Sequence, residues 1–563
     1  MNSFPNEHHV QERKAEKCIG DFNHFFQFIL ALSIHFAYNE VYIQWWRRKQ
    51  NNRQKYYERH MKQLVASPDM IGRLVYLQNS DDYQEGTITR HFHRMFPIII
   101  AISITFILLG IALDDISNIV SGLRRIITMQ DLLITDYVHT AGIGASLINA
   151  GSVMMISILL IKLTGDRFNG FTLAQMGLMF GFSLFGKNVV NIWPIILGTW
   201  LYARYQKEPF AKYTSVALLS TALSPLVSYM AFGSVHASLP MGVLVGILIG
   251  FTLPALSAHT YNVHNGMNLY NMGFACGMFA MMVVPILLAF GDTPDSVLYW
   301  SEDYHQTFAC ILSVFCTILI LSGLFATRTP VREVIARYRR LLSTTGRAPS
   351  DHLRMFGTGA VLVNMGVNGF VGMGYIFLVG GELNGPTLGG IFTIMGFSAF
   401  GKHIFNMVPV MLGASLGAYG MHYTPNYPSL QLAGLFGTTL APISGHFGWP
   451  YGILAGFIHS SLVLQTSGPV AGMNLYNNGF SGGLIAIVLY PTLTAITQHR
   501  RPTLRDEDYH DLFEEIEPID TSNWKELRKD HIEAPPGSHN MRPSRYPQMP
   551  PDDQPSNEET NDS

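Results

Sequence analysis

The chain has 563 residues, of which 48% are hydrophobic and only 13% are charged, with a formal net charge of −2. A soluble domain carries about 25% charged residues, so this composition argues against a soluble fold. The balanced charge gives no reason to expect a nucleic acid as partner. The four cysteines, Cys18, Cys276, Cys310 and Cys316, fit neither a zinc site nor a disulfide framework, and no cofactor, metal or catalytic residue is assigned.

Residues 1–93 form a polar N-terminal region with one mixed stretch, FFQFILALSIHFAYNEVYIQWW at 25–46. His35, Asn39 and Glu40 interrupt this stretch, and a basic run follows it. This pattern favours a helix lying in the membrane interface, with the two tryptophans at headgroup level. A true membrane span is the alternative. No secretory signal peptide is expected at this end.

Residues 94–113 and 307–327 are apolar runs long enough to cross a hydrocarbon core of about 30 Å. Several more such runs lie within 137–290 and 352–497, and they lack the alternation of a membrane β-barrel. The sequence therefore predicts an all-α polytopic membrane protein. Residues 499–563, rich in Pro, Asp, Glu and Asn, are expected to form a disordered tail.

The membrane region contains an internal duplication. GFSLFGKNVVN at 181–191 returns as GFSAFGKHIFN at 396–406, and GMNLYNMGF at 266–274 returns as GMNLYNNGF at 472–480. We therefore divide it into a first repeat, 94–290, and a second repeat, 307–498, each with one leading span and six further apolar segments.

Loop charges predict that the two repeats are inverted in the membrane. The link 114–136 holds four aspartates against two arginines, whereas its partner 328–351 holds six arginines against one glutamate and one aspartate. Equivalent loops of opposite charge indicate opposite sides under the positive-inside rule. Both termini are then expected in the cytoplasm, and inverted repeats place a solute site between the halves.

Each repeat carries one lysine within an apolar stretch, Lys187 and Lys402, between segments too short for a full span. Such a lysine marks either a corner between short spans or the tip of a re-entrant hairpin. In the hairpin, a wet anion-binding cup would contain the lysine together with Asn188, Asn191 and, in the second repeat, Asn406. The alternative is a lysine that reaches the lipid headgroups.

The repeated GMNLYN motif supplies the second group of candidate residues. Its asparagines are three residues apart, which places them on one face of a predicted helix. They are expected either to bind a polar solute or to hold helices together. The residues are Asn268, Tyr270, Asn271, Asn474, Tyr476 and Asn477. Asp136 and Asp351 precede apolar runs and are interpreted as helix N-caps.

The motifs TDY…GIGASLINAG, GFSLFGKNVVNIWPIILG and GMNLYNNGFSGGLIA resemble a family of bacterial polytopic membrane proteins known as domain of unknown function 1576. The resemblance covers about 100–498 and implies a bacterial inner-membrane location, but no substrate. The paired short segments are also loosely similar to urea-transporter architecture. We expect a transporter or channel for a small polar or anionic solute, in contact with membrane lipid. An intramembrane lipid-modifying enzyme and a non-transporting scaffold or sensor are the alternatives, and the oligomeric state is left open.

Overall fold

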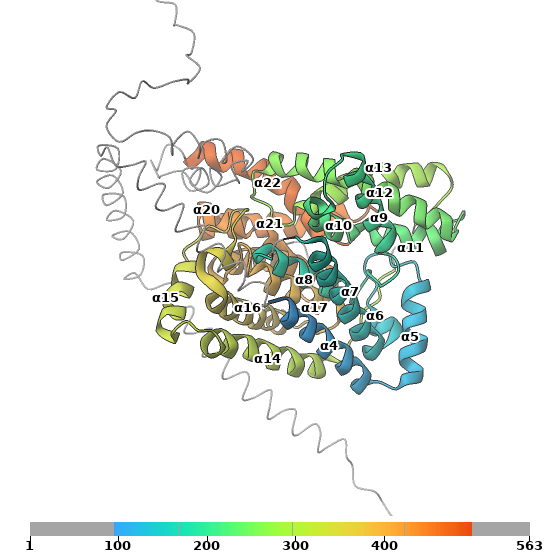
Figure 1. The fold of residues 1–563 in the computed structure, drawn as a ribbon. Helices are drawn as coiled ribbons and strands as arrows, with labels where there is room; N and C mark the ends of the chain where they lie inside the picture. Colours follow the sequence, from blue (N-terminus) through green and yellow to red (C-terminus); the bar gives the residue numbers. More distant parts are fainter. Residues whose placement is uncertain (1–94, 167, 295–296, 421–422, 498–563) are drawn as a thin grey trace, which may run out of the picture. The chain divides into compact units, whose positions relative to one another are not determined.

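The computed structural model describes residues 95–166, 168–294, 297–420 and 423–497 (Figure 1). The predicted interfacial helix at 25–46 and the predicted tail from 499 lie outside these residues. The described helices belong to the unit formed by residues 1–495, apart from the last two residues of the final helix. Described residues contain isolated β-bridges but no strand, and the prediction of an all-α protein is confirmed.

The first repeat contains ten α-helices and two short 3₁₀ turns, η1 (Phe210–Tyr213) and η2 (Thr221–Leu223). The α-helices are α4 (Met95–Leu113), α5 (Ile116–Thr128), α6 (Tyr137–Ala141), α7 (Ile143–Thr164), α8 (Gly170–Phe182), α9 (Trp193–Tyr205), α10 (Thr214–Ser220), α11 (Ser224–Phe232), α12 (Leu239–His264) and α13 (Asn271–Ala289).

The second repeat follows the same order, with a π-helical turn, η3 (Ser322–Ala326), and a 3₁₀ turn, η4 (Gly437–Leu440). Its α-helices are α14 (His305–Leu321), α15 (Val331–Leu341), α16 (His352–Leu378), α17 (Gly385–Phe397), α18 (Ile404–Gly420), α19 (Pro428–Phe436), α20 (Ala441–Phe447), α21 (Trp449–Thr466) and α22 (Asn477–Thr497).

Packing repeats along with sequence. Helix α4 packs on α7 as α14 packs on α16, and α9 packs on α12 as α18 packs on α21. Helices α6 and α7 are separated at Gly142 (φ 86°, ψ 163°), and α16 bends at the equivalent Gly357 (φ 80°, ψ 167°). Side chains rarely adopt such a φ, so glycine at both positions fixes the same bend in both repeats.

Eight helical segments within the described residues are long and apolar enough to span a membrane. Helix α4 shows the pattern clearly, since Ile98, Leu108 and Ile111 are exposed on an almost wholly apolar helix. Exposed apolar side chains on this scale are stable in lipid rather than in water. The chain is therefore a multi-pass membrane protein.

The two links used for the charge argument are not simple loops. They contain the short helices α5 and α15, and the arginine pairs Arg124–Arg125 and Arg339–Arg340 lie on these helices. Arg125 donates to the carbonyl of Thr140 at 2.7 Å, so one member of the first pair contacts the backbone of α6.

Helices α8 and α17 lie side by side near the middle of the view and form the main contact between equivalent elements (Figure 1). A Cβ on Gly181 would lie 2.9 Å from the Cα of Gly389, and one on Gly177 would lie 3.0 Å from the Cα of Gly396. Later residues of α8 therefore meet earlier residues of α17, so the two helices run antiparallel. Opposite directions for equivalent helices are what inverted repeats require.

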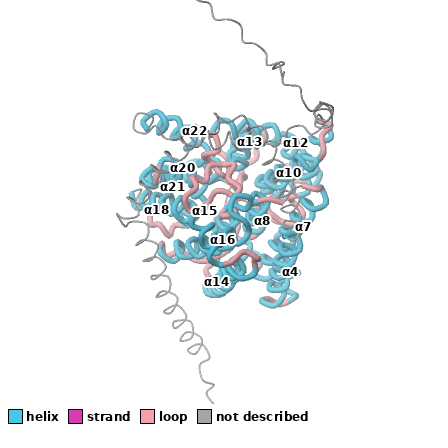
Figure 2. Tube along the Cα trace, turned by 60° about the vertical axis from the view of Figure 1, so that its left-hand side comes forward, coloured by secondary structure: helices cyan, strands magenta, loops and turns pink. Residues whose placement is uncertain are grey.

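Helices α8 and α17 have 13 residues each, which corresponds to about 20 Å and is too short for a span. Each is followed by a non-helical segment, 183–192 or 398–403, before the next helix begins. Figure 2 shows loop segments lying among the helices rather than only at their ends. Such backbone is tolerated inside a membrane protein only where the protein itself satisfies its hydrogen bonds.

Candidate functional site

The lysine loops have the same backbone in both repeats. The amide of Lys187 donates to the carbonyl of Phe182, and that of Lys402 donates to the carbonyl of Phe397, both at 3.0 Å. The preceding glycines have φ angles of 127° at Gly186 and 98° at Gly401. Only glycine adopts these angles without strain, so the loop geometry explains the Gly-Lys dipeptide.

Asparagines from a neighbouring helix secure each loop. Asn149 of α7 donates to the carbonyls of Ser183 and Lys187 at 2.7 and 2.8 Å. Its equivalent on α16, Asn364, donates to the carbonyls of Ser398 and Lys402 at 2.8 and 2.7 Å. These bonds satisfy carbonyls that have no helical partner.

The asparagines at 191 and 406 perform a second matched function. Asn191 donates to the carbonyl of Gly186 at 3.0 Å, and Asn406 donates to that of Gly401 at 2.8 Å. The side-chain oxygen of Asn191 also accepts from the backbone amide of Asn188 at 2.9 Å, and that of Asn406 accepts from the backbone amide of His403 at 3.0 Å. The side chains of Asn191 and Asn406 therefore hold the loop, rather than extending into a cup beside the lysine.

The side chain of Lys187 crosses into the other repeat. Its Nζ lies 2.5 Å from the hydroxyl of Tyr476 and 3.4 Å from the Sδ of Met179. The Nζ also lies 4.6 Å from the ring centre of Tyr476 and 5.9 Å from that of Phe182. A lysine of the first repeat is thus enclosed by a tyrosine of the second, with cation–π contacts on two rings.

Lys402 makes the reciprocal contact. Its Nζ hydrogen-bonds the hydroxyl of Tyr270 and lies 2.7 Å from the hydroxyl of Thr438. The ring centres of Tyr270 and Phe397 lie 4.4 and 5.3 Å from the Nζ. The two lysine–tyrosine pairs therefore join the GFSxFGK motif of each repeat to the GMNLYN motif of the other.

Both lysines have an exposed fraction of 0%. In this structure both lysines are therefore enclosed by protein, and neither extends to the protein surface. Among the described residues, neither lysine has a carboxylate within ion-pair distance. The arrangement is two fully buried lysine amines with neutral hydroxyl partners.

The GMNLYN motif differs from the prediction of one helical face. Asn268 lies before the start of α13 and donates to the carbonyl of Gly479 at 2.9 Å, while Asn474 donates to that of Gly273 at 3.0 Å. These two asparagines link the repeats across the close approach of Gly273 and Gly479.

The second asparagine of each motif faces its own repeat instead. Asn271 donates to the carbonyl of Ser257 at 2.9 Å, and its side-chain oxygen lies 2.9 Å from the Nε2 of His264. Asn477 donates to the hydroxyls of Thr466 and Ser467 at 3.2 and 3.0 Å. Interhelical hydrogen bonding, the alternative interpretation, describes these two residues.

The predicted N-caps are present, and their carboxylates also accept hydrogen bonds from the other repeat. Asp136 accepts from the amide of Val138 in α6, and Asp351 accepts from the amide of Arg354 in α16. Asp351 also accepts from the amide of Gly170, the first residue of α8, at 3.1 Å. Burial raises the pKa of Asp136 to about 7, although backbone donors oppose this change.

The model of a family described as "Protein of unknown function (DUF1576)" matches residues 116–289 and 331–495. The matched stretches cover both repeats and more than half of the chain.

The chain belongs to this family.

No curated protein and no solved structure matches the chain. Because 116 and 331 are equivalent positions of the two repeats, the family match and the internal duplication agree. The DUF1576 family is defined without a function, so the chemistry of the site has to be inferred from its geometry.

One buried polar cluster of this DUF1576 protein was missed by sequence reasoning. Asp131, in the link between α5 and α6, accepts hydrogen bonds from Tyr137, Asn188, Asn191 and Ser228. In the sequence analysis, Asp131 contributed only to the net charge of the link 114–136. The sequence signal that could have identified it is that the equivalent residue of the second repeat, Gly346, is uncharged.

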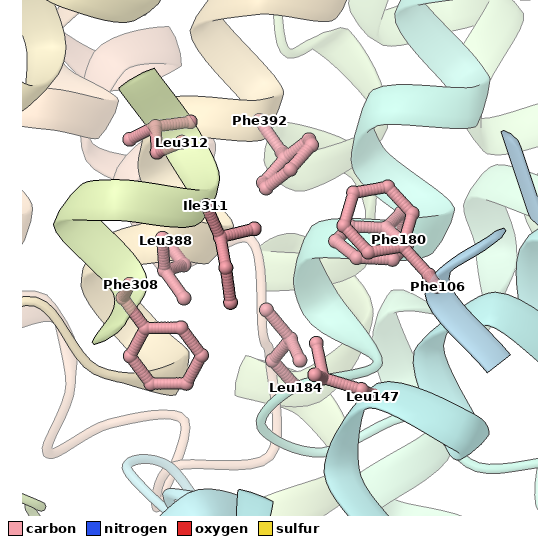
Figure 3. A pocket seen from close by; sticks show the side chains of 9 residues that line it. All are labelled: Phe106, Leu147, Phe180, Leu184, Phe308, Ile311, Leu312, Leu388 and Phe392. Carbon is pink, nitrogen blue, oxygen red and sulfur yellow. The ribbon is translucent and has the colours of Figure 1, made fainter. Parts of the chain in front are cut away.

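The DUF1576 fold also contains a small apolar cavity of about 10 Å³ between α4, α7, α8, α14 and α17 (Figure 3). Its nine lining side chains are all Phe, Leu or Ile. A cavity without polar groups cannot orient a polar solute, so it is not the expected solute site.

Proposed function

We propose that the protein carries a small anion across the membrane along a route between its inverted repeats, past Lys187 and Lys402. The supporting observation is that both lysine side chains are completely buried without a carboxylate partner among the described residues. A lysine in the hydrocarbon region costs at least about 2.5 kcal/mol. An anion bound next to either lysine would offset this cost.

The hydroxyl partners suit an anion. Tyr476 beside Lys187, and Tyr270 and Thr438 beside Lys402, can accept from an ammonium and can also turn to donate to an anion. The surroundings favour a small monovalent anion, because the loop backbone is tightly closed and aromatic rings cover each lysine.

The enclosed lysines correspond to an occluded conformation. An anion would reach them when one repeat tilts against the other, as in alternating access. The glycines at the crossing of α8 and α17 support such tilting, since Gly177 and Gly181 place no side chain between the two backbones there.

Orientation and location complete the proposal. Helix α15 contains four arginines, whereas the equivalent helix α5 contains two. This difference supports a cytoplasmic α15 and cytoplasmic termini under the positive-inside rule. The resemblance to bacterial proteins supports the inner membrane as the location.

The enzyme alternative has two sequence patterns in its favour, GASLG at 413–417 and GFSGG at 479–483, which both fit G-x-S-x-G. That pattern needs a strand-to-helix turn to expose its serine. Ser415 instead lies within α18 and donates to the carbonyl of Met411 at 3.3 Å. Ser481 lies within α22 and donates to the carbonyl of Asn478 at 3.2 Å. The helical position of both serines therefore supports the carrier over a hydrolase.

Flux through liposomes containing the full chain tests the proposal, with nitrate and acetate as anionic probes and urea as the neutral probe. We expect anion flux above that of empty liposomes, reduced at least about tenfold by the double variant Lys187→Met, Lys402→Met. The exposed Lys162 provides the matched control, and Lys162→Gln should leave flux unchanged.

Methionine fills the volume of lysine without a charge, so the double variant should fold and gain thermal stability. Full anion flux in the folded double variant would contradict the proposal. A folded wild type that moves urea but no anion, or moves no probe at all, would also overturn it; the second result favours a scaffold or sensor.

A further inference from the structure

Asp131 is a fully enclosed carboxylate, with an exposed fraction of 1%. The hydroxyl of Tyr137 donates to its Oδ1 at 2.8 Å. Three groups donate to its Oδ2: the hydroxyl of Ser228 at 2.8 Å, and the amide groups of Asn188 and Asn191 at 3.3 Å. Two of these donors belong to the loop that holds Lys187.

The charged and titratable groups around Asp131 are few. Among the residues that the structure describes, Tyr137 from α6 is the one titratable side chain that contacts Asp131, while Ser228 from α11 and the two loop asparagines are neutral. Helix α5 contributes a backbone carbonyl, that of Ile126, to the surroundings of Asp131, and this carbonyl accepts from the side chain of Asn188 at 3.1 Å. Within the described ranges, no Lys, Arg or His lies in ion-pair distance of Asp131.

Burial without a cation favours the protonated carboxyl. It raises the pKa of Asp131 from 3.8 to about 8, although the hydrogen bonds from Ser228, Tyr137, Asn191 and Asn188 oppose the rise. Because the folded pKa lies above the unfolded one, protonation of Asp131 favours the folded state below about pH 4. That contribution is lost as the pH rises through about 8.

We propose that Asp131 is a proton-binding site that couples proton movement to opening of the Lys187 loop, an inference that rests on the proposed anion route. In the ionised form, Oδ2 accepts from three donors. When a proton bonds to Oδ2, this oxygen becomes a donor, and the Ser228 hydroxyl can turn to accept from it. Asn188 and Asn191 then lose an acceptor.

Loss of that acceptor weakens the loop next to Lys187. The side-chain oxygen of Asn188 accepts from the amides of Val190 and Asn191 at 3.0 and 2.9 Å, so its position fixes the backbone that follows the lysine. Protonation therefore loosens the loop that carries Lys187, and a proton and an anion are carried together.

The second repeat shows that the loop does not need this carboxylate. Its equivalents of Asp131 and Ser228 are Gly346 and Gly445, and His403 replaces Asn188. The bond from Asn406 to Gly401 nevertheless persists at 2.8 Å. The carboxylate is thus present in one repeat and absent at the equivalent position of the other, which suits a single coupling proton.

Infrared titration of the purified full chain tests proton binding without any solute. Between about pH 4 and pH 10, we expect a carboxylic-acid carbonyl band with a midpoint near 8 in the wild type. Asp131→Asn should remove the component with a midpoint near 8 and leave the titration of Asp136, whose pKa is about 7. Asp292→Asn is the control, because Asp292 is another buried carboxylate whose donors, such as Ser234 at 3.0 Å, lie away from the lysine loop.

Asp131→Gly is the second variant. It copies Gly346 and suits the φ of 45° at this position, so it should fold even if the asparagine variant does not. Superimposable titrations of the wild type and a folded Asp131 variant would overturn proton binding.

Nitrate uptake driven by a pH gradient tests the coupling. The wild type should accumulate nitrate in liposomes with an alkaline interior, whereas Asp131→Asn and Asp131→Gly should lose accumulation and keep nitrate exchange. Gradient-independent uptake by a wild type that shows the infrared band would overturn the coupling but not the anion route. Absence of all nitrate flux would overturn the route, and the coupling with it.

Discussion

The two lysine loops share one backbone and differ in the chemistry placed around it. Asn149 and Asn364 hold equivalent carbonyls, and Lys187 and Lys402 each reach a tyrosine of the other repeat. Around this common frame, the first repeat has a buried carboxylate and the second has a buried histidine. Duplication thus preserved the geometry that positions the lysines, while titratable groups diverged, which separates the shared anion route from a function specific to one repeat.

The largest effect is expected when each lysine is replaced on its own. Because both line one route, Lys187→Met and Lys402→Met should each reduce nitrate flux at least about tenfold, and the double variant should add little. Flux in liposomes, with thermal stability as a folding control, measures this. Full flux in one single variant would show that its lysine lies off the route.

The next effect concerns the shared frame. Asn149→Ala and Asn364→Ala each remove two hydrogen bonds to buried carbonyls, at a cost of about 1–3 kcal/mol for each carbonyl left unsatisfied. Unfolding in mixed detergent should give similar losses for both variants. A loss in one repeat only would contradict the equivalence of the loops.

A smaller effect is expected where α8 and α17 cross. A Cβ on Gly181 would lie 2.6 Å from the backbone oxygen of Gly389, so Gly181→Ala should destabilise the protein by about 1–3 kcal/mol. Gly468→Ala is the control, because no atom lies within 4 Å of its added carbon. Equal stability of the two variants would show that the repeats do not meet closely at this point.

The smallest effect is expected when the tyrosine hydroxyl beside each lysine is removed, and it should differ between the two lysines. Tyr270→Phe leaves Lys402 with the hydroxyl of Thr438 at 2.7 Å, whereas Tyr476→Phe leaves Lys187, among the described residues, with only the Sδ of Met179 at 3.4 Å. Each lost hydroxyl is worth about 1 kcal/mol or more, and Tyr476→Phe should cost more stability. The reverse order would indicate that Thr438 does not support Lys402.

Sequence alone predicted the repeats, the membrane class and the short helices around each lysine, because these depend on hydrophobic length and on copied motifs. It missed that Asn268 precedes its helix, since a non-helical segment inside a membrane protein is set by tertiary contacts such as the bond to Gly479. It also missed that both lysine side chains are fully buried within the protein. Burial by rings from a distant repeat, such as that of Tyr476, leaves no local pattern in the sequence.

The cluster around Asp131 shows the same limit. Its partners are separated by up to 97 residues, as for Ser228, and no spacing rule joins them. Comparison of the repeats provides the one sequence signal, a charge at 131 where the partner position has glycine.

Anomalous diffraction from crystals grown with iodide would test the anion site most directly. We predict an iodide peak within contact distance of the Nζ of Lys187 or Lys402, and its loss in the double methionine variant. Peaks confined to exposed surface positions, with none beside either lysine, would contradict the account.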